Sequence, residues 1–408
     1  MTPNPHGNDL ERELGRQLHE QVDHRHDAPL DLGDVRGRAG RIRRNRRVAV
    51  GAGVAAALAV IVPTAVLAGG GLNRSQEPDP VRPPAEERVA VHTKLTLDGV
   101  PRGDAPGIEY FTAGGVVLPD DGLVEQETSW QALIPSERDG GWIAFGPARG
   151  EVRYLSEEFE DQGGSDAGDA LVASADRSYV AWTVSEPGAQ TLVLHATTES
   201  GTDRSWDFAA SPPVEPVGVL GDDRVVFQTT NQRTGKVTVG IAEADGSTSG
   251  FADVVDAVAV SADGLVSVVT RINPDDSACF GIVDTAADPR AVVWETCGNS
   301  LGVFSPDGRY VAAGPAYLDG LGDGSLAILD ARTGSELATF DQSRKGRLAL
   351  VHGAWESDDT FVALAVEGAR NALLRFGVDG TLELATDVVK QSGFEDVALY
   401  LGDDRVRH

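Results

Sequence analysis

The chain has 408 residues, of which 41% are hydrophobic and 6% aromatic, and it contains 48 glycines. A chain of this length and apolar content buries a sizeable core, which excludes a protein disordered throughout, and the many glycines favour turns over long helices. The formal net charge is −28, and the excess of acidic residues lies after residue 72. A segment this acidic repels nucleic acid and anionic lipid. Nucleic-acid binding is therefore excluded as the role of residues 73–408.

The first 47 residues form an arginine-rich tail with two predicted helices. Leu10, Leu14, Leu18 and Val22 recur at helical spacing, and a second helix is expected to begin at Asp31. Two short helices bury too little surface to fold alone. We therefore expect either a weakly ordered topogenic tail or a helix that docks on a cytoplasmic partner.

Residues 48–72 carry no charge. As a helix these residues span about 37 Å, enough for a hydrocarbon core of about 30 Å. Residues 36–47 hold seven arginines and no acid, whereas residues 73–87 mix both signs of charge. This bias predicts a single-pass cell-membrane protein with a cytoplasmic N-terminus and an extracytoplasmic C-terminal domain. The alternative is a signal peptide cleaved near Ala68.

Residues 73–88 form a proline-rich linker. Four prolines fall within residues 73–87, which predicts an extended spacer. The outer domain is then expected to occupy residues 89–408.

One turn-plus-strand unit recurs through the outer domain. Its clearest copy reads SPDGRYVA, from Ser305 to Ala312. The marker aspartates of the copies are Asp139, Asp176, Asp222, Asp263, Asp307, Asp358 and Asp403. Repeats of this length indicate an array of similar units.

A second turn signal alternates with the first, as in the strand–turn–strand sequence from Leu326 to Phe340. Two turns in each unit imply about four short strands, and the run from Lys236 to Ile241 alternates as a half-buried strand should. Repeated four-stranded units predict an all-β fold, a β-propeller in which each blade buries its faces against its neighbours. The length of residues 107–408 favours seven blades, with six as the alternative because the first unit, near Tyr110, is degenerate.

The units SPDGRYVA and LDARTG, the latter at Leu329–Gly334, resemble those of WD-repeat and TolB-like propellers. The Gly-His and Trp-Asp pairs of WD repeats are missing, so the resemblance is to the looser bacterial kind. It implies the architecture and leaves the activity open.

The tail, at Leu10–Asp23 and Asp34–Arg47, resembles tails that precede the transmembrane helix of many actinobacterial membrane proteins. Such proteins are often associated with extracytoplasmic-function sigma factors. The resemblance implies a regulatory connection, with a sigma factor or another cytoplasmic regulator as the partner.

Cys279 and Cys297 are the only cysteines, and they flank a predicted strand–turn–strand hairpin. In an oxidising compartment such a pair is expected to form a structural disulfide. A redox-active pair is the alternative, although the CxxC spacing is absent.

No motif predicts catalysis, a cofactor or a metal. The run Gly246–Gly250 has threonine where a nucleophile elbow needs serine, and zinc, phosphate-loop and dinucleotide signatures are missing. His195, in the strand TLVLH, is interpreted as a blade residue and not a base. The acidic runs at residues 157–169 and 319–323 lack the calcium-loop pattern, so we expect solvated loops there.

These observations lead to three hypotheses. The first is a membrane-anchored binding, sensing or scaffold module, regulatory through its tail. The alternative is a propeller hydrolase or lyase whose site is assembled at the central channel, a type of site that motifs do not reveal. The third is a structural surface protein with an inert tail.

Overall fold

The computed structural model describes residues 90–112, 114–126, 130–146, 150–166, 170–221, 223–274, 277–316, 324–342, 347–390, 399–401 and 405–407. The chain divides into two compact units, Met1–Pro84 and Ala85–His408. The predicted tail, membrane span and linker lie outside the described residues. Among the described residues, no helix is long and apolar enough to span a bilayer.

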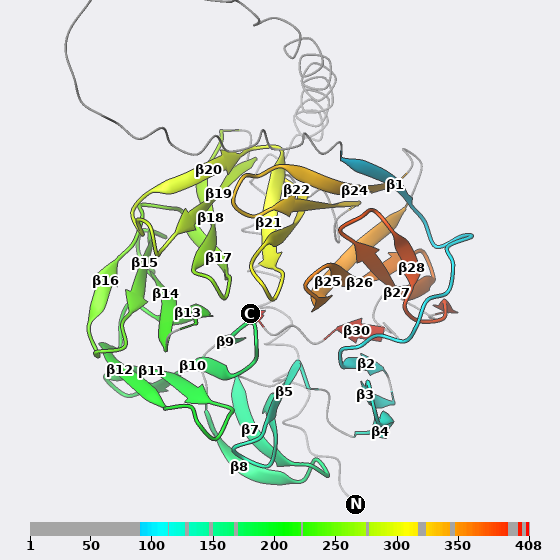
Figure 1. Ribbon diagram of the computed structural model, residues 1–408. Coiled ribbons are helices and arrows are strands. Elements are labelled where there is room, and N and C mark those ends of the chain that lie inside the picture. The colour runs from blue at the N-terminus through cyan, green and yellow to red at the C-terminus, as the bar shows by residue number, and fades with distance from the viewer. Residues whose placement is uncertain are drawn as a thin grey trace, which may run out of the picture. The chain divides into compact units, whose positions relative to one another are not determined.

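The second unit is built from seven sheets arranged as a ring, each with a core of four antiparallel strands and with its innermost strand toward the centre (Figure 1). This is a seven-bladed β-propeller. The predicted all-β class is therefore confirmed, as is the choice of seven blades over six.

The blades are numbered around the ring, and their strands are given from the innermost outward. Blade 1 contains β30 (Leu399–Leu401), β2 (Tyr110–Thr112), β3 (Gly115–Leu118) and β4 (Gly122–Glu125); blade 2 contains β5 (Ala132–Ser136), β6 (Gly141–Phe145), β7 (Glu151–Ser156) and β8 (Asp161–Asp166); blade 3 contains β9 (Ala170–Ala173), β10 (Tyr179–Glu186), β11 (Ala189–Ala196) and β12 (Arg204–Ala209). Blade 4 contains β13 (Val214–Leu220), β14 (Arg224–Thr230), β15 (Val237–Ala242) and β16 (Thr248–Gly250); blade 5 contains β17 (Asp256–Val260), β18 (Leu265–Ile272), β19 (Ala278–Asp284) and β20 (Val292–Thr296). Blade 6 contains β21 (Asn299–Phe304), β22 (Tyr310–Pro315), β23 (Ser325–Asp330) and β24 (Glu336–Gln342); blade 7 contains β25 (Leu348–Ser357), β26 (Thr360–Glu367), β27 (Arg370–Gly377) and β28 (Leu382–Leu384), with β29 (Val389–Lys390) also paired to β27.

Each blade packs both of its faces against neighbouring blades. In one cluster, Ile143 and Phe145 of blade 2 lie against Leu171 and Val180 of blade 3, and all four are fully buried. Burying a side chain of this size stabilises the fold by about 1.5–3 kcal/mol. The ring is therefore held mainly by apolar contacts between blades.

The central strands are consequently buried on both faces, which corrects one expectation. The run predicted as a half-buried strand forms β15, but Val239 and the three residues after it are all buried. Gly240 leaves room for the ring of Phe227, because a Cβ there would lie 2.7 Å from that ring. Alternation fails because the neighbouring blade covers the face that would otherwise meet water.

The ring is closed by strands from the two ends of the domain. The innermost strand of blade 1, β30, pairs antiparallel with β2, joining Leu401 to Tyr110 and Leu399 to Thr112. Leu401 is buried against Leu364 and Leu373 of blade 7. The first unit looks degenerate in sequence because its innermost strand comes from the other end of the chain.

Two further strands lie outside the four-stranded pattern. A strand that precedes blade 1, β1 (Val91–Leu95), pairs in parallel with β24 at the outer edge of blade 6. The last strand, β31 (Arg405–Arg407), pairs with β9, the innermost strand of blade 3. Neither pairing is predicted by the repeat.

Candidate functional site

The recurring serine–aspartate turns lie between the first and second strands of the blades. In blade 6, the Ser305 hydroxyl donates to the Asp307 carboxylate at 2.8 Å and accepts from the Tyr310 backbone N–H at 3.0 Å. Burial raises the pKa of Asp307, but hydrogen bonds from Ser305 and Arg309 outweigh it and hold that pKa below its ordinary value. The marker aspartate is thus a turn-forming residue.

A serine–aspartate hydrogen bond also forms in blades 2, 3, 5 and 7, across three residues in blade 2 and across two in the others. One of the predicted markers changes. In blade 7, the Ser357 hydroxyl donates to Asp359 at 2.9 Å, whereas the marker chosen from the sequence was Asp358. Two adjacent aspartates made the register of that turn ambiguous. The markers Asp222 and Asp403 lie outside the described residues.

Because successive strands of a blade run in opposite directions, the first-to-second and third-to-fourth turns lie at the same end of every blade. We call this end the turn face. Its third-to-fourth turns carry at least one carboxylate in six blades, and in blade 6 Asp330 ends the third strand directly before that turn. Representative residues are Asp121, Glu158, Glu199, Asp245, Asp288, Asp330 and Asp379. The described turns of this face contain arginines but no lysine, and the carboxylates outnumber the arginines, so the face has a negative potential.

Two arginines at the turn face, Arg332 and Arg204, each tie one blade to the next. Arg332, in the LDARTG turn of blade 6, pairs with Asp263 and Asp284 of blade 5. Arg204 of blade 3 pairs with Asp223 of blade 4 at 2.6 Å. The positive charge of this face is thus largely engaged within the ring, which leaves the exposed carboxylates to face solvent.

Two tryptophans make a second kind of tie between blades. The indole N–H of Trp206, on β12, donates to the Glu243 carbonyl of blade 4, and that of Trp294, on β20, donates to the Ala331 carbonyl of blade 6, both at 2.9 Å. Both bonds reach 37 residues along the chain. The outer strand of one blade is thus fixed to the turn face of the next.

Replacing either tryptophan by phenylalanine removes this bond and keeps an aromatic ring. We expect Trp206→Phe and Trp294→Phe each to lower the free energy of unfolding by about 0.5–1.5 kcal/mol. The double variant should lose the sum of the two, because the sites lie in different blades and share no partner. Urea denaturation of the three variants checks this, and unchanged stability in both single variants contradicts it.

His195, on β11, lies between two carboxylates of the turn face. Its Nε2 is 2.9 Å from Asp139 of blade 2, and its Nδ1 is 3.3 Å from Asp203 of its own blade. The ring also meets Tyr154 edge-on, with centroids 5.7 Å apart. Burial raises the pKa of Asp203, but the Ala196 N–H, His195 and an arginine outweigh it, so that pKa is lowered. As the sequence predicts, His195 is a blade residue, and it bridges two blades.

The hydrogen bonds among Ser136, Asp139 and His195 run in a different order from those of a catalytic serine, histidine and aspartate. The Ser136 hydroxyl donates to Asp139 Oδ2 at 2.6 Å, and the same oxygen contacts His195 Nε2. The aspartate therefore stands between serine and histidine, whereas activation of a serine nucleophile requires histidine beside the hydroxyl. The cluster holds blades 2 and 3 together.

The segment that leads into blade 1 is anchored on blade 7 by a nearly buried ion pair. Arg375 pairs with Glu356, and these side chains are 15% and 11% exposed. Arg375 also donates to the carbonyls of Asp104 and Ala105, both at 3.1 Å, and the Gly107 N–H donates to Glu356. Burial raises the pKa of Glu356, but the Arg375 and Gly107 hydrogen bonds outweigh it, so the pKa lies below its ordinary value of 4.5.

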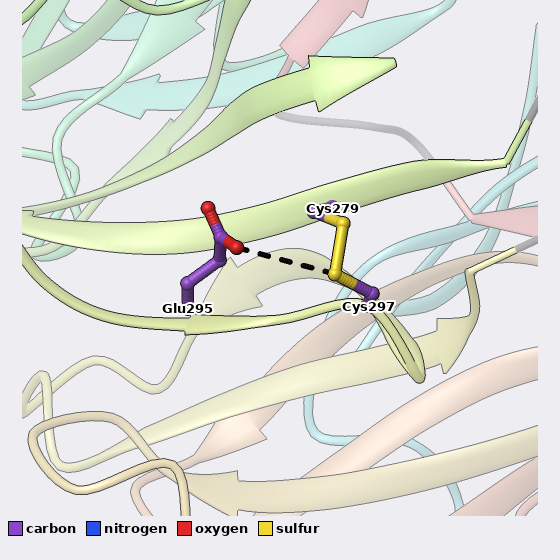
Figure 2. A group of neighbouring side chains, drawn as sticks. All are labelled: Cys279, Glu295 and Cys297. Carbon is purple, nitrogen blue, oxygen red and sulfur yellow. Dashed lines mark hydrogen bonds between the residues drawn. A yellow bond between two sulfur atoms is a disulfide. The ribbon is translucent and has the colours of Figure 1, made fainter. Parts of the chain in front are cut away.

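Cys279 and Cys297 form a disulfide across the hairpin of β19 and β20. Figure 2 shows the bond with Glu295 beside Cys297. The two sulfurs and a Glu295 oxygen lie within 4.8 Å of one another, the spacing of a metal site. Two sulfurs bonded to each other offer no thiolate, the form that binds metals, so in this oxidation state the residues do not fit a metal ion.

The two acidic runs of the sequence are only partly described by the structure. Residues 319–323 and 167–169 lie outside the described residues. The described part of the first run lies in the third-to-fourth turn of blade 2 and along β8. The run Gly246–Gly250 forms a turn and the strand β16.

No family model matches the chain, and no curated protein matches it. Several solved structures do. The Dos1 propeller is 15% identical, with a TM-score of 0.44, covering 68% of this chain and 78% of that chain. The propeller domain of the Trilobed protease from Pyrococcus furiosus is 13% identical, with a TM-score of 0.45, covering 69% and 87%. TolB from Acinetobacter baumannii is 14% identical, with a TM-score of 0.39, covering 64% and 63%. At these identities and TM-scores the likeness says nothing about activity.

Most of the ties between blades carry no signal in the sequence. The signal for one of them was visible, because Arg332 stands in a turn that the repeat identified. For the bridge made by His195, the repeat identified the turn of Asp139, but nothing in the sequence links that turn to His195, which lies 56 residues further along the chain. Only the assembled ring brings these groups together.

Proposed function

We propose that this protein is a membrane-anchored extracytoplasmic β-propeller that binds a cationic partner through its turn face, and that its cytoplasmic tail connects binding to a regulator such as a sigma factor. The observation that carries the proposal is the composition of the turn face. Carboxylates occur in the third-to-fourth turn of six blades and directly before it in blade 6, while Arg204 and Arg332 engage neighbouring blades.

Rigidity supports a binding role. The ring is tied by the ion pairs of Arg332 and Arg204 and by the indole bonds of Trp206 and Trp294. A scaffold whose loops are already fixed loses little conformational entropy when a partner binds. Complementary charge on a partner raises its association rate and selects against acidic competitors.

Membrane anchoring and the regulatory role are supported by the sequence alone. The uncharged run at residues 48–72 and the seven arginines before it favour a single span with the propeller outside. The tail resembles those of sigma-factor-associated membrane proteins. The described residues offer no observation that favours the hydrolase or lyase alternative, and it stays untested.

Co-purification from native membranes tests the proposal. The intact protein is expected to recover an extracytoplasmic partner that raised salt releases, because attraction between exposed charges is screened. It is also expected to recover a cytoplasmic regulator, which a variant lacking residues 1–30 loses while keeping the outer partner. Recovery of the same proteins by both forms contradicts a signalling tail. An extracytoplasmic partner whose recovery does not change with salt concentration contradicts binding through the charged turn face.

A further inference from the structure

The disulfide of blade 5 joins a buried cysteine to an exposed one. Phe280 of β19 is opposite Thr296 of β20, so the adjacent Cys279 and Cys297 also face each other at the end of the hairpin. Cys279 is fully buried, whereas Cys297 is exposed. A nucleophile from solvent therefore reaches the bond from the Cys297 side.

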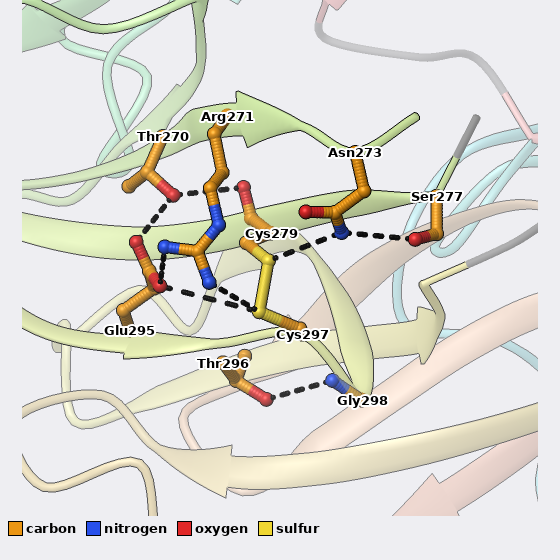
Figure 3. The surroundings of a disulfide bond; sticks show 9 residues. All are labelled: Thr270, Arg271, Asn273, Ser277, Cys279, Glu295, Thr296, Cys297 and Gly298. Atoms are coloured by element: carbon orange, nitrogen blue, oxygen red, sulfur yellow. Dashed lines mark hydrogen bonds and ion pairs between the residues drawn. A yellow bond between two sulfur atoms is a disulfide. The ribbon is translucent and has the colours of Figure 1, made fainter. Parts of the chain in front are cut away.

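Each sulfur has a hydrogen-bond donor beside it (Figure 3). The Arg271 guanidinium lies 3.2 Å from the Cys297 sulfur, and the side-chain amide of Asn273 lies 3.6 Å from the Cys279 sulfur. Arg271 is held by Glu295 at 2.7 Å, and Glu295 accepts from the Thr270 hydroxyl at 2.7 Å. The cationic donor thus stands beside the exposed sulfur and the neutral donor beside the buried one.

This arrangement matches what thiol–disulfide exchange requires. A thiolate attacks one sulfur in line with the bond, and the negative charge moves from the attacking sulfur to the leaving sulfur. A guanidinium beside the attacked sulfur lies next to the incoming thiolate and stabilises its charge as it approaches. An amide donor beside the leaving sulfur stabilises it as it departs.

We propose that Cys279–Cys297 is a thiol-exchange site, at which an external thiolate attacks Cys297 and Cys279 is the leaving group. Arg271 stabilises the charge of the incoming thiolate, and Glu295 moderates Arg271 by pairing with it. The substrate is a thiol, carried by a small molecule or by a dithiol protein.

The reaction balances in two steps. The external thiolate forms a sulfur–sulfur bond to Cys297, and the bond between Cys297 and Cys279 breaks, leaving the electron pair on Cys279, which takes up a proton. A second thiolate then attacks the external sulfur of the mixed disulfide and releases Cys297 as a thiolate. Two thiols are oxidised to one disulfide, and the protein disulfide is reduced to two cysteines.

The first experiment locates the attacked sulfur in the full-length, unaltered protein. The folded protein is treated with glutathione in one arm and with thioredoxin, a dithiol protein, in the other. Free thiols are alkylated rapidly, and peptides are mapped by mass spectrometry. Glutathione or thioredoxin is expected on Cys297 with alkylated Cys279, in about tenfold or greater excess over the reverse arrangement, because Cys279 is inaccessible. The arm that reacts identifies the source of the thiol.

The second experiment separates the charge effect from a structural one. Arg271→Gln is expected to slow the first step about fivefold to tenfold, and Glu295→Gln is expected to speed it, because it releases Arg271 from its pairing. Arg233→Gln, in an exposed turn of blade 4, is the matched control and should leave the rate unchanged. A purely structural role for these side chains would speed the reaction in both variants by loosening the hairpin.

The proposal is overturned if Cys279 is attacked as often as Cys297. It is also overturned if neither thiol reduces the folded protein while both reduce the urea-denatured protein, or if Arg271→Gln does not slow the reaction.

Discussion

Replacing Arg375 by alanine is expected to lower the free energy of unfolding by about 3–5 kcal/mol, because it leaves Glu356 charged and nearly buried without its partner. The same change frees the carbonyls of Asp104 and Ala105, which Arg375 holds against blade 7. We therefore expect the segment that leads into blade 1 to lose protection from amide hydrogen exchange. Denaturant unfolding and hydrogen exchange measure the two effects.

Arg370→Ala is the matched control for this variant. Arg370 pairs with Asp98, which is 75% exposed, and with Glu367, and the arginine is itself 35% exposed, so its removal should cost about 1 kcal/mol or less per pair. Equal losses in the two variants would contradict the role given to the buried pair.

The effect of Arg375→Ala should also depend on pH. The pKa of Glu356 is lowered in the folded state, so its ionised form contributes stability above the unfolded-state pKa, near 4.5, and that contribution is lost as pH falls through the lower folded-state pKa. The difference in stability between the native protein and Arg375→Ala should therefore be full at neutral pH and shrink below about pH 4. A difference that grows on acidification would contradict the assignment.

Ending the chain after residue 398 is expected to prevent cooperative folding of the propeller. It removes β30, which closes the ring by pairing with β2, and with it the buried side chain of Leu401. Without β30 the ring does not close, and the blades beside the gap expose faces that only a neighbouring blade can bury. A single domain has only about 5–15 kcal/mol of stability to lose.

A chain that ends after residue 401 provides the comparison. It keeps β30 and removes β31, so it should retain a cooperative thermal transition in calorimetry. The stability of Leu401→Ala in the full chain should lie between those of the two shortened chains, with a loss of about 2–5 kcal/mol in the free energy of unfolding. A cooperative transition in the chain that ends after residue 398 would contradict closure by β30.

Local features of the fold were predictable from the sequence. The turn at Ser305 and Asp307 and the hairpin between Leu326 and Phe340 are encoded within a few residues, because the side chains that form each turn stand beside it. The disulfide followed from the same logic, since its hairpin joins neighbouring strands.

Long-range features were not predictable. The pairing of β1 with β24 and of β31 with β9 joins segments that share no repeat pattern. The burial of Val239 and its neighbours depends on the adjacent blade. The bridge from His195 to Asp139 likewise depends on how two blades meet, and no local propensity fixes that.

Site-specific photo-crosslinking in native membranes tests most directly whether the turn face binds the partner. A photoreactive residue is placed at Glu199, in the third-to-fourth turn of blade 3, or at Glu186, at the opposite end of the same blade, and both positions are exposed. We predict a salt-sensitive crosslink to one cationic partner from position 199 and none from position 186. Equal crosslinking from both positions, or crosslinking from position 186 alone, would contradict a binding role for the turn face.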